Sequence, residues 1–144
     1  MKQLDHQKTI ELLQTIMEFE FAGVIRYTQY CLVASSSNVT SIVDFLQEQA
    51  SESLTHAQLV GKFIISFNAY PKPRIAPIEE INEYSVKTIL TASQSHEAKA
   101  LELYKVLLEV VRGSNIKLEE FLNKMITEEG SHHQELEQMI QDLA

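Results

Sequence analysis

The chain has 144 residues, a length that suits one domain with a sizeable core, and its four glycines and three prolines leave little material for a β-rich architecture. Its net charge of −8 argues against a general nucleic-acid-binding surface and favours the attraction of cations, although an ordinary acidic cytosolic protein would show the same charge. The single cysteine excludes an intrachain disulfide, the polar N-terminal residues are unlike a signal peptide, and no apolar run is long enough to span a membrane. We therefore expect one all-α domain over residues 1–144, located in a reducing cytoplasm.

Four helices are predicted from apolar residues that recur with helical period. Their approximate ranges are 5–35, 41–68, 78–112 and 117–144. Turn-forming sequences, SSSN after the first helix and RGSN after the third, separate the members of each pair, and Thr40 or Ser41 can cap the second helix. Short turns imply that the paired helices are antiparallel neighbours.

The two predicted pairs are joined by residues 69–77, which hold all three prolines and cannot be helical. About ten extended residues span roughly 33 Å, whereas a helix of about 28 residues is about 42 Å long. This segment could therefore nearly carry the chain back along the bundle, which predicts a long crossover between the second and third helices. The alternative is a tight proline-rich turn with no crossover.

A carboxylate and an imidazole stand three residues apart on the predicted fourth helix, at Glu129 and His132. On a helix this spacing puts both side chains on one face, where they can bind the same metal ion. Such a pair also arises by chance in helices rich in Glu, where both side chains are simply solvated.

The first half of the chain carries a second copy of this pattern. When SESLTHAQL at residues 51–59 is laid on the later stretch, Glu52 matches Glu128 and His56 matches His132. The two halves therefore resemble a duplicated helix pair.

A further repeat joins the first and third predicted helices, because Glu20 precedes Tyr27 by seven residues and Glu97 precedes Tyr104 by the same interval. Seven residues are about two helical turns, so each Glu shares a face with its Tyr. Ionisable side chains that all turn inward need a cation to share. His96, next to Glu97, is expected to be exposed.

This pattern resembles the ferritin-like superfamily and is most similar to bacterioferritins, whose helices supply one Glu from each of two helices and Glu-x-x-His from each of the other two. The similarity covers nearly the whole chain. The segments that carry it are EFAGVIRY at 20–27, ESLTHA at 52–57, EAKALELY at 97–104 and EEGSHH at 128–133. The resemblance implies a four-helix bundle with the long crossover between the second and third helices.

The resemblance also implies a di-iron centre with assigned ligands. Carried over residue by residue, the terminal carboxylates are Glu20 and Glu97, the terminal imidazoles are His56 and His132, the bridging carboxylate is Glu129, and the tyrosine near the centre, which could donate an electron, is Tyr27.

Three positions depart from the bacterioferritin pattern. Ser53 stands where the second bridging Glu is expected, so Glu52 or Glu48 would have to replace it, and we count Glu52 among the predicted ligands. Leu54 stands where bacterioferritins have a haem-ligating Met, so no haem is expected. The chain stops at Ala144 without the short fifth helix of large ferritin shells, so we expect a homo-oligomer that is a dimer or larger, with the cage size open.

The function implied by this resemblance is that of a ferroxidase, which binds two Fe(II) ions and oxidises them with dioxygen or peroxide for iron storage or detoxification. The expected partners are iron ions, the oxidant and further copies of the chain, with no nucleic acid and no membrane. The alternative, favoured by Ser53, is a ferritin-like structural or interaction module with an incomplete or single-metal site and no turnover.

Overall fold

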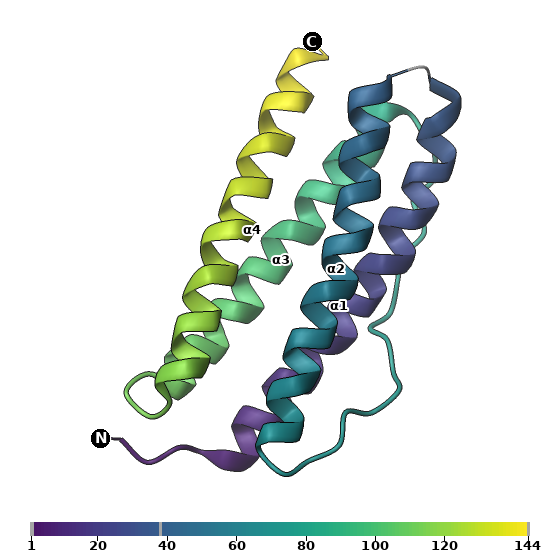
Figure 1. The fold of residues 1–144 in the computed structure, drawn as a ribbon. Coiled ribbons are helices and arrows are strands. Elements are labelled where there is room, and N and C mark those ends of the chain that lie inside the picture. The colour runs from purple at the N-terminus through teal and green to yellow at the C-terminus, as the bar shows by residue number, and fades with distance from the viewer. Residues whose placement is uncertain (1, 38, 144) are drawn as a thin grey trace.

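The computed structural model describes residues 2–37 and 39–143, and every regular element in these ranges is helical. The elements are α1 (His6–Ala34), the short 3-10 helix η1 (Ser35–Ser37), α2 (Thr40–Ser66), α3 (Val86–Val111) and α4 (Ile116–Asp142). The four long helices form a bundle in which α1 lies against α2 and α3 against α4 (Figure 1). The predicted all-α four-helix bundle is confirmed. Within the described residues, no helix is long and apolar enough to cross a membrane.

Polar side chains set the start of three of the helices. Asp5, Ser85 and Asn115 each accept a hydrogen bond from a backbone N–H in the first turn of α1, α3 and α4 respectively. The predicted cap of α2 is wrong, because Thr40 is already the first helical residue and the preceding Val39 has an apolar side chain that cannot cap.

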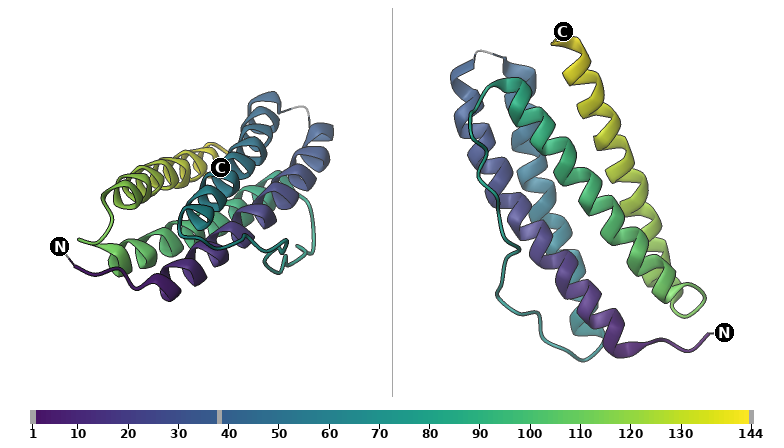
Figure 2. Two further views of the ribbon diagram at one scale, coloured as in Figure 1. Left: turned by 60° about the horizontal axis from the view of Figure 1, so that its bottom comes forward. Right: turned by 180° about the vertical axis from the view of Figure 1, so that it is seen from behind.

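A long crossover joins α2 to α3 and runs along α1 (Figure 2). The Ala76 N–H donates to the Glu18 carbonyl at 3.0 Å, and the Lys72 N–H donates to Gln14 Oε1 at 2.9 Å. The crossover is therefore confirmed and the tight turn is excluded. The predicted start of α3 at residue 78 is wrong, because α3 begins at Val86. The crossover has to return over the length of α2, which is about 40 Å. This distance takes more extended residues than the proline-rich segment alone contains.

Two apolar clusters fill the two ends of the bundle, and a layer of polar side chains separates them. One cluster includes Leu13, Val60 and Leu122, and the other includes Leu46 and Leu136. Along each helix the buried carboxylates and histidines fall between the stretches that contribute to the two clusters. The bundle therefore holds its ionisable groups at mid-height, away from both ends.

Candidate metal centre

Each of the four helices places at least one ionisable side chain in the middle layer. Five carboxyl or imidazole side chains there have only 2–5% of their surface exposed: Glu20, His56, His96, Glu97 and Glu129. Burying such groups is costly unless they are paired with opposite charge or coordinate a metal ion. Their arrangement must therefore explain how the charge is compensated.

Three of these side chains, Glu20, His56 and Glu129, form the first group, in which one ligand atom from each lies within 4.8 Å of the others. His56 Nδ1 lies 2.8 Å from Glu20 Oε2 and 3.6 Å from Glu129 Oε1. Burial alone would lower the pKa of His56, but the hydrogen bond to Glu20 and its negative charge outweigh this effect and raise the pKa. The positive charge that His56 gains on protonation therefore interacts favourably with Glu20.

A second group of three, formed by Glu97, Glu129 and His132, has its ligand atoms within the same 4.8 Å limit. Glu129 belongs to both groups. Glu129 Oε2 and His132 Nδ1 are buried without a hydrogen-bond partner among the described residues, and they lie 3.9 Å apart. A cation between them would satisfy both atoms, and mixed carboxylate and imidazole donors suit iron. The chemistry of these residues therefore fits iron.

The surroundings of Glu97 and Glu129 favour the protonated forms of both carboxyl groups. Burial, with the charge of nearby carboxylates, raises the pKa of Glu129 to about 7. Burial and the hydrogen-bonded neighbour Glu129 likewise raise the pKa of Glu97 well above its ordinary value. Bound cations would remove this penalty, because they favour the ionised carboxylates.

The tyrosines that repeat at the same spacing pair across the two halves. The Tyr27 hydroxyl donates to Glu97 Oε1 at 2.6 Å, and the Tyr104 hydroxyl donates to Glu20 Oε2 at 2.9 Å. Both rings are fully buried, and burial raises the pKa of each hydroxyl well above its ordinary value. Each tyrosine therefore remains a donor that fixes the orientation of a carboxylate in the other half.

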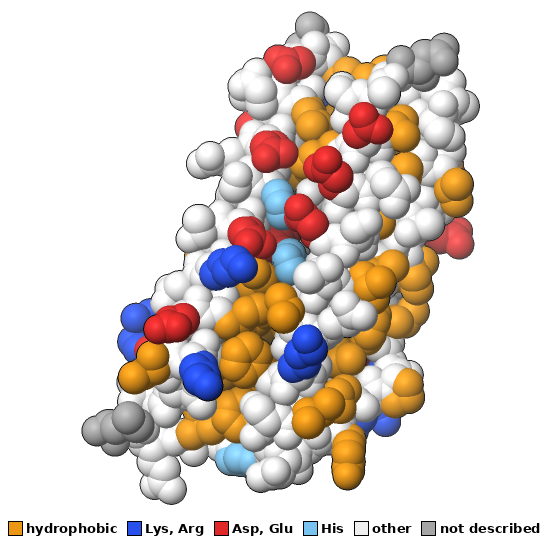
Figure 3. Space-filling view, viewed as in Figure 1, with side chains coloured by type: hydrophobic (Ala, Val, Ile, Leu, Met, Phe, Trp, Pro, Cys, Tyr) orange, Lys and Arg blue, Asp and Glu red, His pale blue; other side chains and the backbone are white. Residues whose placement is uncertain are grey.

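Glu52 does not join either group of ligand atoms. Its Oε2 lies 3.0 Å from His132 Nε2, while Glu128 Oε2 lies 3.3 Å from His56 Nε2, so each half-exposed Glu pairs with the His of the opposite half. Figure 3 shows acidic side chains gathered around histidines on the face formed by α2 and α4. Glu48 is exposed, and Ser53 is buried in the layer. Among the described residues, neither Glu52 nor Glu48 therefore belongs to the two groups of candidate ligands.

His96 was expected to be exposed, and this expectation is wrong: only 4% of its surface is accessible. Its ring stacks on Phe19 with centroids 4.2 Å apart and meets Tyr27 edge-on at 5.5 Å. Burial, together with the charges of Arg26 and Lys99, lowers the pKa of His96 to about 3, so the ring is neutral. The duplicated pattern contained a signal for this contact, because Phe19 precedes Glu20 as His96 precedes Glu97.

Comparison with known proteins places this bundle among characterised folds. Residues 10–144 match the Ferritin family, which is described as a ferritin-like domain. The chain is similar to a dodecameric thioferritin, the bacterioferritin-related protein of Bacteroides fragilis (TM-score 0.91, 20% identity, 98% of this chain and 89% of that one). It is also similar to a ferritin-like diiron-carboxylate protein of Bacillus anthracis (TM-score 0.87, 20% identity, 94% of this chain and 97% of that one). A further similar structure is the bacterioferritin of Rhodobacter capsulatus (TM-score 0.86, 20% identity, 97% of this chain and 87% of that one). No curated protein sequence matches the chain. Because the family match spans nearly its whole length, the chain belongs to the ferritin-like domain family.

Proposed function

We propose that this protein is a di-iron carboxylate ferroxidase, which binds two Fe(II) ions per chain as substrate and oxidises them with dioxygen or peroxide for iron storage or detoxification. The observation that carries the proposal is the pair of buried ligand groups that share Glu129. The Bacillus anthracis neighbour is described as a diiron-carboxylate protein, which is consistent with this chemistry.

The residues divide the binding work between two positions. Glu20 and His56 would hold one Fe(II), Glu97 and His132 would hold the other, and Glu129 would contact both. The tyrosine hydroxyls keep the two terminal carboxylates pointed inward. Protons on the carboxyl groups and on His56 must leave as Fe(II) enters, so loading releases protons and is favoured by rising pH.

Two Fe(II) ions held together supply the two electrons that convert one dioxygen, with two protons, to hydrogen peroxide. Tyr27 donates a hydrogen bond to Glu97, and where only one Fe(II) is bound it would supply the second of these electrons. The apolar clusters above and below the layer limit the entry of water, which strengthens the electrostatic interactions between ligands and cations.

The test is an anaerobic titration of the metal-free protein with Fe(II), followed by admission of air while the absorbance of the ferric product is recorded. We expect saturation at two Fe(II) per chain and oxidation much faster than in buffer alone. Saturation at one or no Fe(II), without accelerated oxidation, would replace the proposal with the alternative.

That alternative is a ferritin-like structural or interaction module, or a single-metal protein without turnover, and Ser53 is the residue that favours it. The two functions differ in their response to Glu129→Ala. In a working centre, Fe(II) raises the melting temperature of the wild type by mass action, and this variant loses the gain. In a module without a centre, neither protein responds to the metal.

We also propose that copies of the chain assemble into a homo-oligomer. Leu32, Ile65 and Ile116 are each more than half exposed, and the Bacteroides fragilis neighbour is described as dodecameric. A reducing cytoplasm suits the free thiol of Cys31. Light scattering on the purified protein measures the assembly directly, and a monomer at micromolar concentration would contradict this part of the proposal.

A further inference from the structure

Gly23 lies at a point where α1 passes between a polar atom of α2 and one of α3. A Cβ atom placed on Gly23 would lie 2.8 Å from Ser53 Oγ and 2.9 Å from His96 Nε2. Both contacts are closer than real Cβ atoms allow, so a larger residue at this position would force one or both of these side chains to move. Ser53 and His96 therefore face the same space, next to the position where a second bridging carboxylate is absent.

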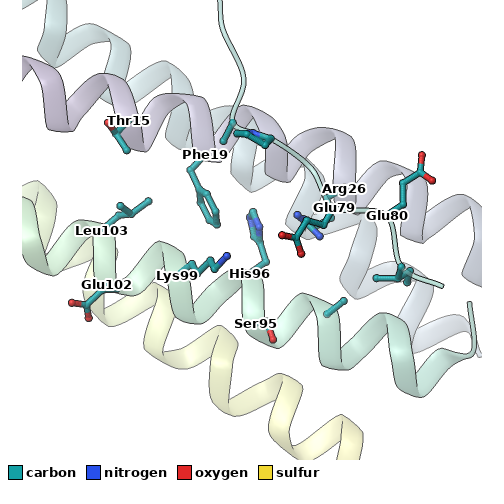
Figure 4. Close-up of a pocket in the computed structure, with 14 residues that line it drawn as sticks. Thr15, Phe19, Arg26, Glu79, Glu80, Ser95, His96, Lys99, Glu102 and Leu103 are labelled. Atoms are coloured by element: carbon teal, nitrogen blue, oxygen red, sulfur yellow. The ribbon is translucent and has the colours of Figure 1, made fainter. Parts of the chain in front are cut away.

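His96 has no hydrogen-bond partner for either ring nitrogen among the described residues, although both nitrogens are buried. Figure 4 shows the ring projecting from α3 toward α1 beside Phe19, at the floor of a pocket of about 680 Å³ between α1, α3 and the crossover. A buried polar side chain without partners costs free energy, and in native proteins it indicates a water molecule, an ion or a functional role that the apoprotein does not satisfy.

The number of ligand atoms available at the centre bears on the role of His96. Each of the two groups contains three candidate ligands, and both contain Glu129, so a second bridging residue would have provided one more donor on the side of Ser53. In the metal-free protein His96, like Glu52, lies outside both groups, so its ring would have to move toward the centre to bind a metal ion there. Imidazole is an effective iron ligand, whereas a serine hydroxyl is a poor one beside carboxylates. Phe19, the counterpart of His96 in the first half of the chain, has no donor atom.

We propose that His96 is a further metal ligand of this centre, which supplies from α3 the donor that Ser53 does not supply from α2. Gly23 permits this because it leaves the path between the two side chains open. The inference rests on the proposed di-iron function and adds a ligand to it.

The experiment compares His96→Leu in the wild-type background and in the Ser53→Glu background, with Fe(II) affinity measured anaerobically. In the wild-type background we expect the affinity of one of the two sites to fall at least about tenfold. In the Ser53→Glu background, where a carboxylate again occupies the bridging position, His96→Leu should cost little. The matched control is His6→Leu, which removes a histidine bonded to the Phe67 carbonyl at the end of the bundle and should leave affinity unchanged.

Two further readouts separate a ligand from a structural residue. The metal-free His96→Leu protein should melt at a higher temperature than the wild type, because it buries no unpartnered nitrogen. Its Co(II) complex should show a changed visible spectrum, because a nitrogen donor is lost. Should the leucine variant not fold, His96→Gln serves for the same comparisons.

The outcomes distinguish the inference from the function on which it rests. If the wild type binds two Fe(II) and His96→Leu matches it in affinity and Co(II) spectrum, the inference is overturned while the proposed function stands. An equal loss of affinity in both backgrounds would also overturn it, because His96 would then act on the fold rather than in place of the carboxylate. If the wild type binds no metal, both proposals fall.

Discussion

Glu129→Gln should stabilise the metal-free protein at pH 8 and abolish its response to Fe(II). The carboxyl is buried among other carboxylates, which raises its pKa from the ordinary 4.5 to about 7. Because one pKa unit corresponds to about 1.4 kcal/mol, keeping this carboxyl ionised at pH 8 costs the folded state up to about 3 kcal/mol. Glutamine has nearly the same shape and carries no charge, so the variant avoids this cost. For a chain of this size the gain corresponds to a rise in melting temperature of roughly 9 °C at most.

The pH dependence of the same measurement has a defined sign. Since the pKa of Glu129 is higher in the folded protein, the folded state binds more protons than the unfolded state between pH 4.5 and about 7. The unfolding free energy of the wild type should therefore decrease as the pH rises through this range. The advantage of the variant should vanish near pH 4, where the wild-type carboxyl is protonated in both states.

Urea unfolding in the presence of a chelator, at pH 4.5, 6 and 8, measures these differences. Glu135→Gln, an exposed change on the same helix, is the matched control and should shift stability by less than about 0.5 kcal/mol. A Glu129→Gln protein that is less stable than the wild type at pH 8 without metal would refute the reasoning, because the carboxylate would then be stabilised by its neighbours. Retention of the Fe(II)-induced shift by the variant would remove Glu129 from the bridging position.

Three further results are expected. Fe(II) affinity should fall as the pH is lowered below about 7, because Glu129 must release its proton; calorimetry in buffers of different ionisation enthalpy counts the protons released. Tyr27→Phe should retain Fe(II) binding but slow oxidation and remove any tyrosyl radical signal in electron paramagnetic resonance, whereas Tyr104→Phe should keep that signal. Ser85→Ala should cost about 1 kcal/mol in urea unfolding through loss of the α3 cap, without a change in iron binding.

The sequence was sufficient to predict the bundle and to select candidate ligands that lie together in its middle layer, because both depend on helical spacing. Glu129 and His132 are three residues apart and face the same way in the structure, as local geometry requires. Internal repetition added the remaining ligands, since Glu20 and Glu97 stand at matching distances from Tyr27 and Tyr104. Each of these spacings, of three or seven residues, lies within about two turns of a single helix.

Features that depend on how helices lie against one another could not be predicted in this way. Glu52 is on a suitable face of α2, but it extends to His132 of α4 and stays outside both ligand groups. His96 is buried because α1 lies against that side of α3, a contact that the spacing within α3 does not reveal. The start of α3 depended on how far the crossover had to travel, and this distance is set by the length of α2.

The energetics of the middle layer bear on the choice between a metal centre and a module that lacks one. A bundle with no use for a metal would gain stability from apolar residues at these positions, because buried charged groups seldom repay their desolvation. The layer nevertheless keeps Glu20, Glu97 and Glu129 buried, and each half supplies a tyrosine that holds a carboxylate of the other half inward. Ser53 removes one carboxylate from this set but leaves the crossed hydrogen bonds in place. We expect side chains arranged in this way to lower stability in the metal-free state and to recover it when cations bind, as the proposed metal centre requires and a structural core does not.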